Sequence, residues 1–249
     1  GLHYGTGVFE GIRAYATERG AAIFRLQDHL HRMLQGATLL GLPFDPEAIG
    51  RACVETLVAN RMGDAYLRPL TYYSGGGLSL DVGSLTASTL VAALPWKTHC
   101  DAAGVRTQIT RYRRNSRSAL PPLKLCGGYV NAILAKREAM AQGFEEALFL
   151  DEAGYVVEAT GENLFLVKSG QVVAVDHPDA LPGITRATLI ELAGAQSRMV
   201  HVSELGDADE LFFTGTSAEV APITLLDGRQ LPSGPITREL RELYLDVVR

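Results

Sequence analysis

The stretch from residue 147 to residue 175 constrains the fold most, because short apolar segments alternate there with turn sequences. Lys168-Ser169-Gly170 predicts a tight hairpin between the last two segments, and Asp227-Gly228 predicts another. The periodicity favours helices at 184–195 and 235–248, which would flank the sheet. We therefore predict a compact sheet or a barrel-like core. The expected strands are 147–150, 155–158, 163–167 and 171–175.

The first part of the chain has mixed helix and strand patterns. Residues 28–41 predict an amphipathic helix with Asp28 as its N-cap, and residues 46–61 predict a second helix. β-rich runs follow at 66–73 and 89–94, and then a polar stretch without periodicity. The pattern predicts an α+β fold in two domains. These are a small domain at 1–97, a linker at 98–104 and a larger domain at 105–249, which opens with a strand at 105–112 and a helix at 129–142.

Composition excludes several classes of protein. The 249 residues are 47% hydrophobic and 20% charged, which is typical of a globular protein. A net charge of -5 argues against nucleic acid and membrane surfaces as partners, and no apolar run reaches the roughly 20 residues of a membrane span. Three separated cysteines indicate neither a disulfide framework nor a metal site, and favour the cytoplasm. The opening Gly-Leu-His-Tyr has no Met, so we expect part of the amino terminus to be missing.

Lysine is rare in this sequence, with four among 23 basic residues, and Lys124 stands out among them. Lys97, Lys136 and Lys168 fall in the linker, a helix and a hairpin, where solvated roles suffice. Lys124 lies in Leu-Pro-Pro-Leu-Lys-Leu-Cys-Gly-Gly-Tyr, and the nearest charge upstream is Arg117. Apolar surroundings disfavour the charged amine and make it a nucleophile for carbonyl groups. The alternative is a lysine at a strand end whose amine reaches solvent.

Two segments predict anion sites. Leu181-Pro182-Gly183-Ile184-Thr185 precedes a predicted helix, so the amides of Ile184 and Thr185 and the Thr185 hydroxyl would face a ligand at the helix N-terminus. Thr214-Gly215-Thr216-Ser217-Ala218-Glu219 offers the same groups after a buried strand. Each segment alone is also typical of a helix cap. Together with a buried lysine, they indicate a phosphorylated aldehyde as ligand.

Several side chains in apolar strands need partners. Glu158 and Glu162 bracket Ala-Thr-Gly, and buried carboxylates require compensation. One interpretation is a glycosidase-like acid/base pair. The other is a carboxylate facing a protonated pyridine nitrogen, which suits a Schiff-base lysine and a phosphate site. Tyr66 and Arg68 alternate onto one strand face, where they either orient a substrate carboxylate or form a structural pair.

Six blocks of the sequence, in order, match one known family: 4–13 (Tyr-Gly-Thr-Gly-Val-Phe-Glu-Gly-Ile-Arg), 65–70, Lys124 with Gly127 to Tyr129, 158–165, 181–186 and 214–219. From Tyr4 to Val248 the sequence thus resembles the fold-type IV pyridoxal-phosphate enzymes, and among them the branched-chain amino acid aminotransferases. The resemblance implies that N-terminal strands of the first domain are missing here. The resemblance implies the two-domain fold of the D-amino acid aminotransferase type, with a small N-terminal α/β domain and a larger barrel-like domain. It also implies pyridoxal 5'-phosphate as cofactor and a homodimer or higher homo-oligomer.

The resemblance also implies residue roles. Lys124 would hold the cofactor as a Schiff base and move the substrate proton, Tyr129 would bind the ring oxygen, and Glu158 would pair with the pyridine nitrogen. The phosphate would be bound by Arg32, Ile184, Thr185 and Thr216. The substrate carboxylate would be bound by Tyr66, supported by Arg68, and by Thr216 and Ser217. Phe9, Arg13 and Trp96 would form the side-chain pocket, and Tyr4, Leu78 and Leu80 would reach in from a partner subunit.

The expected reaction is transamination of leucine, isoleucine and valine with 2-oxoglutarate. The alternatives of the same fold are a D-amino-acid aminotransferase and a 4-amino-4-deoxychorismate lyase, and a non-catalytic remnant is a further one. The Tyr66-x-Arg68 pattern and the Gly-Gly-Tyr after Lys124 resemble the branched-chain type. Two positions depart from the family pattern. His99 stands where relatives often have tyrosine, and Gly128 stands where they often have asparagine.

Overall fold

The computed structural model describes residues 1–96 and 104–249, which form two compact units. The first unit comprises residues 1–96 with Leu123–Tyr129 and Arg249, and the second comprises residues 104–122 and Val130–Val248. Lys97 and all but the last residue of the linker predicted at 98–104 lie outside the described residues. The segment that carries Lys124 belongs to the first unit, although we expected it within the domain at 105–249. The domain boundaries themselves stay a prediction.

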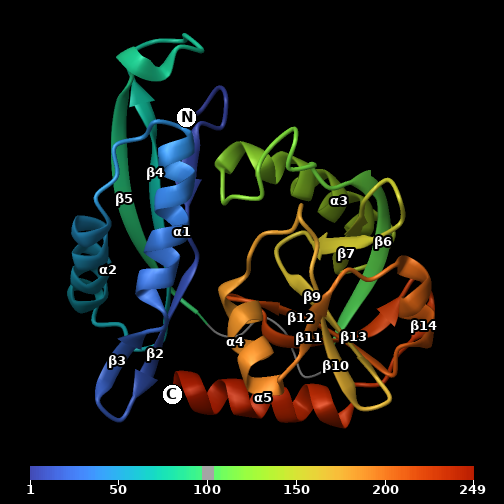
Figure 1. Ribbon diagram of the computed structural model, residues 1–249. Helices are drawn as coiled ribbons and strands as arrows, with labels where there is room; N and C mark the ends of the chain where they lie inside the picture. Colours follow the sequence, from blue (N-terminus) through green and yellow to red (C-terminus); the bar gives the residue numbers. More distant parts are fainter. Residues whose placement is uncertain (97–103) are drawn as a thin grey trace. The chain divides into compact units, whose positions relative to one another are not determined.

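An antiparallel sheet forms the centre of the first unit (Figure 1). Strands β1 (Gly7–Phe9) and β2 (Ile12–Thr17) pair with β4 (Ala65–Gly75) in one continuous register. The ladder is interrupted between them at Pro69, which has no N–H to donate. β3 (Gly20–Ile23) pairs with β2, and β5 (Thr86–Pro95) pairs with β4. A short 3-10 helix, Val82–Ser84, precedes β5.

Helices α1 (Leu26–Leu39) and α2 (Pro46–Asn60) pack on this sheet through an apolar cluster. Asp45 caps α2 by accepting hydrogen bonds from the N–H groups of Glu47 and Ala48. The prediction of Asp28 as N-cap of the first helix was wrong. The helix begins earlier because Leu26 packs against the cluster, and Asp28 instead pairs with Arg25. The buried members of the cluster are Ile12, Ala14, Leu30, Ile49, Cys53, Leu57, Ala65 and Leu67.

In the described part of the chain the second unit contains a nine-stranded sheet with the order β11-β10-β9-β12-β13-β6-β7-β8, and β14 pairs with β13. β8 ends at Ala159 and β9 begins at Asn163, yet four strands separate them in this order. The sheet must curl to bring them together, and Ala159 N–H donates to the Glu162 oxygen at 2.8 Å. The predicted barrel-like core in an α+β fold is therefore confirmed. The strands are β6 (Val105–Arg113), β7 (Glu146–Leu150), β8 (Val156–Ala159), β9 (Asn163–Lys168), β10 (Gln171–Val175), β11 (Gln196–Arg198), β12 (Glu210–Gly215), β13 (Glu219–Leu226) and β14 (Arg229–Gln230).

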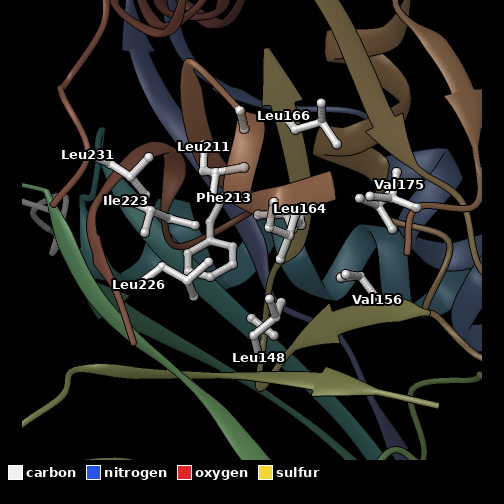
Figure 2. Packing of buried hydrophobic residues seen from close by; sticks show 14 of the residues in the cluster. Leu148, Val156, Leu164, Leu166, Val175, Leu211, Phe213, Ile223, Leu226 and Leu231 are labelled. Carbon is white, nitrogen blue, oxygen red and sulfur yellow. The ribbon is translucent and has the colours of Figure 1, made fainter. Parts of the chain in front are cut away.

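Alternation along the strands fills the inside of the curled sheet with aliphatic side chains. Leu164 and Leu166 of β9 point into one cluster with Leu211 and Phe213 of β12 (Figure 2). Phe165, between the two leucines, lies on the opposite face and stacks on Phe212 with ring centroids 5.0 Å apart. Both faces of these strands are buried, which explains their almost continuous apolar sequence.

The predicted hairpins and helices are present in the second unit. Ser169 and Gly170 have φ of 51° and 78°, and Asp227 and Gly228 have φ of 46° and 86°, as a two-residue hairpin turn of type I′ requires. None of the helices in the described ranges is long and apolar enough to cross a membrane. The 3-10 helix Cys126–Gly128 lies in the first unit. It is followed along the chain by α3 (Tyr129–Ala141), α4 (Ile184–Ala193), the 3-10 helix Val202–Asp207 and α5 (Pro235–Val248).

Candidate active site

The segment around Lys124 is attached to the first unit through its backbone. Phe9 N–H donates to the Lys124 carbonyl oxygen at 3.3 Å, and Gly127 N–H donates to the Gly5 oxygen at 3.0 Å. A β-carbon on Gly5 would lie 2.6 Å from the Gly127 Cα, and Gly5 has a φ of 64°, so both space and backbone require glycine there. This close approach holds the backbone of Lys124 beside β1.

The Lys124 amine lies against two aromatic side chains. Its Nζ donates a hydrogen bond to Tyr129 Oη at 2.8 Å, and lies 5.2 Å from the centroid of the Phe9 ring. The Phe9 and Tyr129 rings meet edge to face, with centroids 4.8 Å apart. The structure therefore brings together three predicted residues, Phe9, Lys124 and Tyr129, which we call the lysine cluster.

The predicted carboxylate-binding residues extend from the lysine cluster along the same sheet. Arg68 Nη2 donates to Tyr66 Oη at 2.6 Å, and the guanidinium carbon lies 4.7 Å from the Phe9 ring centroid. Tyr66 stacks on Trp96 with centroids 4.7 Å apart. A β-carbon on Gly11 would lie 1.9 Å from Tyr66 Oη, so this glycine provides the space that Tyr66 fills.

Arg13 lies directly opposite Tyr66 in the pairing of β2 with β4. Because β1 and β2 share one register with β4, Phe9 and Arg13 project from the same face of the sheet. The Arg13 side chain is buried, and its guanidinium carbon lies 4.8 Å from the Tyr15 ring centroid. Arg13 thus shares a face with the predicted substrate residues, and its place in the side-chain pocket stays a prediction.

Arg32, the predicted phosphate ligand of the first unit, belongs to a buried charged group that includes two residues we did not predict. Its Nε and Nη2 donate to Glu10 Oε1 and Oε2 at 2.7 Å and 2.8 Å, and His29 Nδ1 lies 2.8 Å from Glu10 Oε2. Burial by itself would raise the pKa of Glu10, but Arg32 and His29 outweigh burial and hold it at about 2. Burial lowers the pKa of His29. A neutral imidazole therefore adjoins a carboxylate–guanidinium pair.

Glu158 is one of several buried carboxylates of the second unit. Its Oε1 accepts from Arg114 Nε at 2.8 Å, and its Oε2 accepts from the Leu181 N–H at 3.0 Å and from Asn163 Nδ2 at 3.5 Å. Arg114 Nη1 also donates to Asn131 Oδ1 at 3.3 Å. We call Arg114, Glu158 and Asn163 the glutamate cluster. Each of the three named contacts places a hydrogen-bond donor against the Glu158 carboxylate.

The predicted anion site before α4 has the expected local structure. The helix begins at Ile184 with Gly183 as N-cap, and glycine has no side chain to accept from the first amides. Thr185 is buried in the first turn. The amides of Ile184 and Thr185 therefore lie at the start of a ten-residue helix, where an anion is stabilised.

The second predicted anion segment forms a different structure. Residues 216–218 form the loop of a hairpin between β12 and β13, closed by the pair Gly215 and Glu219. We expected this segment to offer the same groups as a helix N-terminus, and that expectation was wrong. Glu219, with a φ of 54°, begins a strand and not a helix. Thr216 and Ser217 lie in the hairpin loop, and their contacts with phosphate and carboxylate stay predictions.

Glu158 and Glu162 have separate sets of partners in the structure. Burial and the charge of Glu146 raise the pKa of Glu162 to about 8. Glu146 accepts hydrogen bonds from Thr160 Oγ1 and from Lys136 Nζ, both at 2.5 Å. Glu162 thus belongs to a carboxyl pair with Glu146, whereas Glu158 is held by the donors described above.

The residues predicted to reach in from a partner lie together in the first unit. Tyr4 Oη donates to the Leu78 oxygen at 3.1 Å, and the side chains of Tyr4, Leu78 and Leu80 are exposed. Their contribution to a second subunit stays a prediction. Of the two departures from the family pattern, Gly128 ends the 3-10 helix Cys126–Gly128, and His99 lies outside the described residues.

Sequence reasoning missed Glu10, His29, Arg114 and Asn163 as parts of these groups. Glu10 gives a usable signal, since it is the one charged residue in the otherwise apolar stretch from Gly7 to Ile12. Arg114 gives none, because it stands beside Arg113 in a basic stretch and its partner is 44 residues away.

Known proteins match this chain over nearly its whole length. The family described as Amino-transferase class IV matches residues 7–226. A branched-chain-amino-acid aminotransferase of Pseudomonas aeruginosa is 36% identical, over 99% of this chain and 85% of that protein. The structure of a branched-chain aminotransferase from Thermoproteus uzoniensis with norvaline superimposes with a TM-score of 0.94 at 42% identity, covering 99% of this chain and 86% of that one.

A second solved structure carries a cofactor adduct. It is a T.th. branched-chain amino acid aminotransferase complexed with N-(5'-phosphopyridoxyl)-L-glutamate, with a TM-score of 0.93 and 41% identity over 99% of this chain and 86% of that one. The resemblance seen in the sequence blocks is therefore confirmed: this chain belongs to the class IV aminotransferases, the fold-type IV enzymes that use pyridoxal phosphate.

Proposed function

We propose that this enzyme transfers the amino group of leucine, isoleucine or valine to 2-oxoglutarate, giving branched-chain 2-oxo acids and glutamate. The observation that carries the proposal is the lysine cluster, in which a lysine amine lies 2.8 Å from a tyrosine hydroxyl beside an aromatic ring. The names of the relatives support the branched-chain substrates. The glutamate adduct of the T.th. enzyme supports glutamate and 2-oxoglutarate as the second pair.

The residues present fit pyridoxal phosphate. They supply an amine paired with a phenol, a helix N-terminus whose N-cap is glycine, and a buried carboxylate. When bound, this cofactor accepts the electron pair that the substrate Cα releases with its proton. Lys124 would bind the cofactor carbonyl and then carry the Cα proton, and Tyr129 would hold the ring oxygen. Glu158 would hold the proton on the pyridine nitrogen.

The remaining predicted residues orient the two ends of the ligands. Ile184, Thr185 and Thr216 would bind the phosphate together with Arg32. Tyr66, fixed by Arg68, would receive the substrate carboxylate along with the amides of Thr216 and Ser217. A charge-assisted hydrogen bond to a buried carboxylate contributes roughly 1.5 to 3 kcal/mol, which is enough to fix the substrate in one orientation. Phe9 and Trp96 would form the apolar wall for a branched side chain.

Replacement of Lys124 tests the proposal. Lys124→Ala should lose the visible absorption band of lysine-bound cofactor and almost all transamination, whereas the control Lys168→Ala, in an exposed hairpin, should keep both. Borohydride reduction followed by peptide mapping should place the pyridoxyl group on Lys124. A Lys124→Ala protein with the wild-type spectrum and near-normal turnover would remove the assignment.

Substrate assays separate the related activities. L-leucine with 2-oxoglutarate should be converted, and D-alanine and 4-amino-4-deoxychorismate should not. A preference for D-alanine, or release of pyruvate from 4-amino-4-deoxychorismate, would replace the proposal with one of the two alternative activities. A protein that stays colourless after incubation with pyridoxal phosphate would indicate a non-catalytic remnant.

We also propose a homodimer or higher homo-oligomer in the cytoplasm. The exposed Leu78 and Leu80 support an oligomer, and the free thiols of Cys53 and Cys126 support a reducing compartment. Light scattering on the purified protein should give a mass of at least twice 26.8 kDa, and a monomer would contradict this part of the proposal.

A further inference from the structure

Asn163 connects two parts of the second unit that the proposed function assigns to opposite ends of the cofactor. Its Nδ2 donates to the Leu181 oxygen at 3.0 Å and to Glu158 Oε2 at 3.5 Å. The Leu181 N–H donates to the same Glu158 oxygen at 3.0 Å. Leu181 is thus bound through both its amide and its carbonyl, two residues before the Gly183 N-cap of α4.

Gly183 completes this connection from the other side. Its φ of -71° is one that any residue adopts, so the backbone does not demand glycine. The available space does demand glycine, because a β-carbon at this position would lie 1.9 Å from Asn163 Oδ1. The Asn163 amide therefore packs directly against the N-cap while its nitrogen holds the residue that binds Glu158. Asn163 is 6% exposed and Glu158 is 4% exposed, so solvent has little access to either group.

We propose that Asn163 is a positioning residue that sets the separation between Glu158 and the N-terminus of α4, so that one rigid ligand reaches both. This inference rests on the proposed function, in which Glu158 binds the pyridine nitrogen and the α4 amides bind the phosphate. A ligand that spans both sites gains from their fixed spacing, because the second contact forms within the same complex. A ligand that reaches a single site gains nothing from it.

Binding of three ligands to the full-length protein stripped of cofactor tests the inference. Pyridoxamine phosphate spans both sites, pyridoxamine carries the ring alone, and inorganic phosphate occupies the phosphate site alone. In Asn163→Ala the Kd of pyridoxamine phosphate should rise at least about tenfold, the change that one lost hydrogen bond produces. The Kd values of pyridoxamine and inorganic phosphate should stay within about twofold of wild type, because Asn163→Ala removes no contact with either ligand.

A second variant displaces the Asn163 amide while keeping the Asn163 side chain. Gly183→Ala places a methyl group against Asn163 Oδ1 and should give the same selective loss. Equal losses for all three ligands in both variants would show a general structural role and overturn the inference, and so would unchanged binding of pyridoxamine phosphate.

A third variant separates failure of this inference from failure of the proposed function. Glu158→Gln should weaken pyridoxamine and pyridoxamine phosphate together, because both carry the ring nitrogen. If Glu158→Gln leaves both Kd values unchanged, Glu158 does not bind the ring and the site assignment fails. If Glu158→Gln weakens both but the two positioning variants do not discriminate, the site assignment stands and the inference fails.

Discussion

Replacement of Glu10 by glutamine should destabilise the protein by about 3 kcal/mol at pH 7. Glu10 is fully buried, and Arg32 and His29 lower its pKa from 4.5 to about 2 despite burial. This difference corresponds to about 3 kcal/mol in favour of the ionised form, at 1.36 kcal/mol for each pKa unit. Glu10→Gln keeps the shape of the side chain but removes the charge. The free energy of unfolding of the cofactor-free protein, measured with urea and the fluorescence of Trp96, gives the comparison.

The pH dependence identifies the cause of this loss. The pKa of Glu10 is lower in the folded protein, so its contribution is complete well above pH 4.5 and disappears as the pH falls toward 2. At pH 3.5, one unit below the unfolded pKa, about 1 kcal/mol of the difference between wild type and Glu10→Gln should be gone.

A double variant serves as the control. Glu10→Gln with Arg32→Gln removes both buried charges and should recover much of the stability that the single variant loses. A difference between wild type and Glu10→Gln that is constant from pH 7 to pH 3.5 would refute the electrostatic reasoning and leave side-chain packing as the explanation.

Three further substitutions test other parts of the molecule. Gly11→Ala should displace Tyr66 and lower the free energy of unfolding by about 1 to 3 kcal/mol, measured with urea. The pKa of Glu162 is raised to about 8, so its contribution to the free energy of unfolding is complete below pH 4.5 and is lost as the pH rises through 8. Glu162→Gln should abolish this decline in stability, measured by urea titrations from pH 5 to 9. Arg13→Met should raise the KM for glutamate and 2-oxoglutarate well above that for leucine, and equal losses in steady-state assays would show that Arg13 is structural.

The strands of the second unit follow from sequence because their signal is local. Two short apolar runs and the Ser169-Gly170 turn between them predict β9 and β10, and the structure has both strands. The N-cap of α1 was mispredicted for the opposite reason. Asp28 has the right chemistry for a cap, but burial of Leu26 against other elements extends the helix past it.

In the candidate site, too, local signals could be predicted from the sequence and distant contacts could not. Lys124 could be singled out because few lysines compete with it and its neighbours are apolar. The partners of the predicted residues could not be identified, since Arg114 meets Glu158 across 44 residues and Glu10 meets Arg32 across 22. Such pairs depend on how the chain folds back on itself, and the local sequence around one residue does not indicate which distant residue will be its partner.

The parallel pairing of β6 with β13 determines when the curled sheet can close during synthesis. Ile109 and Asp227, at this junction, are bonded across 118 residues. At a translation rate of about 5 to 20 residues per second, roughly 6 to 24 s pass between the emergence of the two strands from the ribosome. Throughout that time one edge of β6 has no neighbour, and an unpaired edge is a template for aggregation. We therefore expect the nascent chain to depend on chaperones until residue 226 has emerged, and to be most vulnerable when translation pauses after β6.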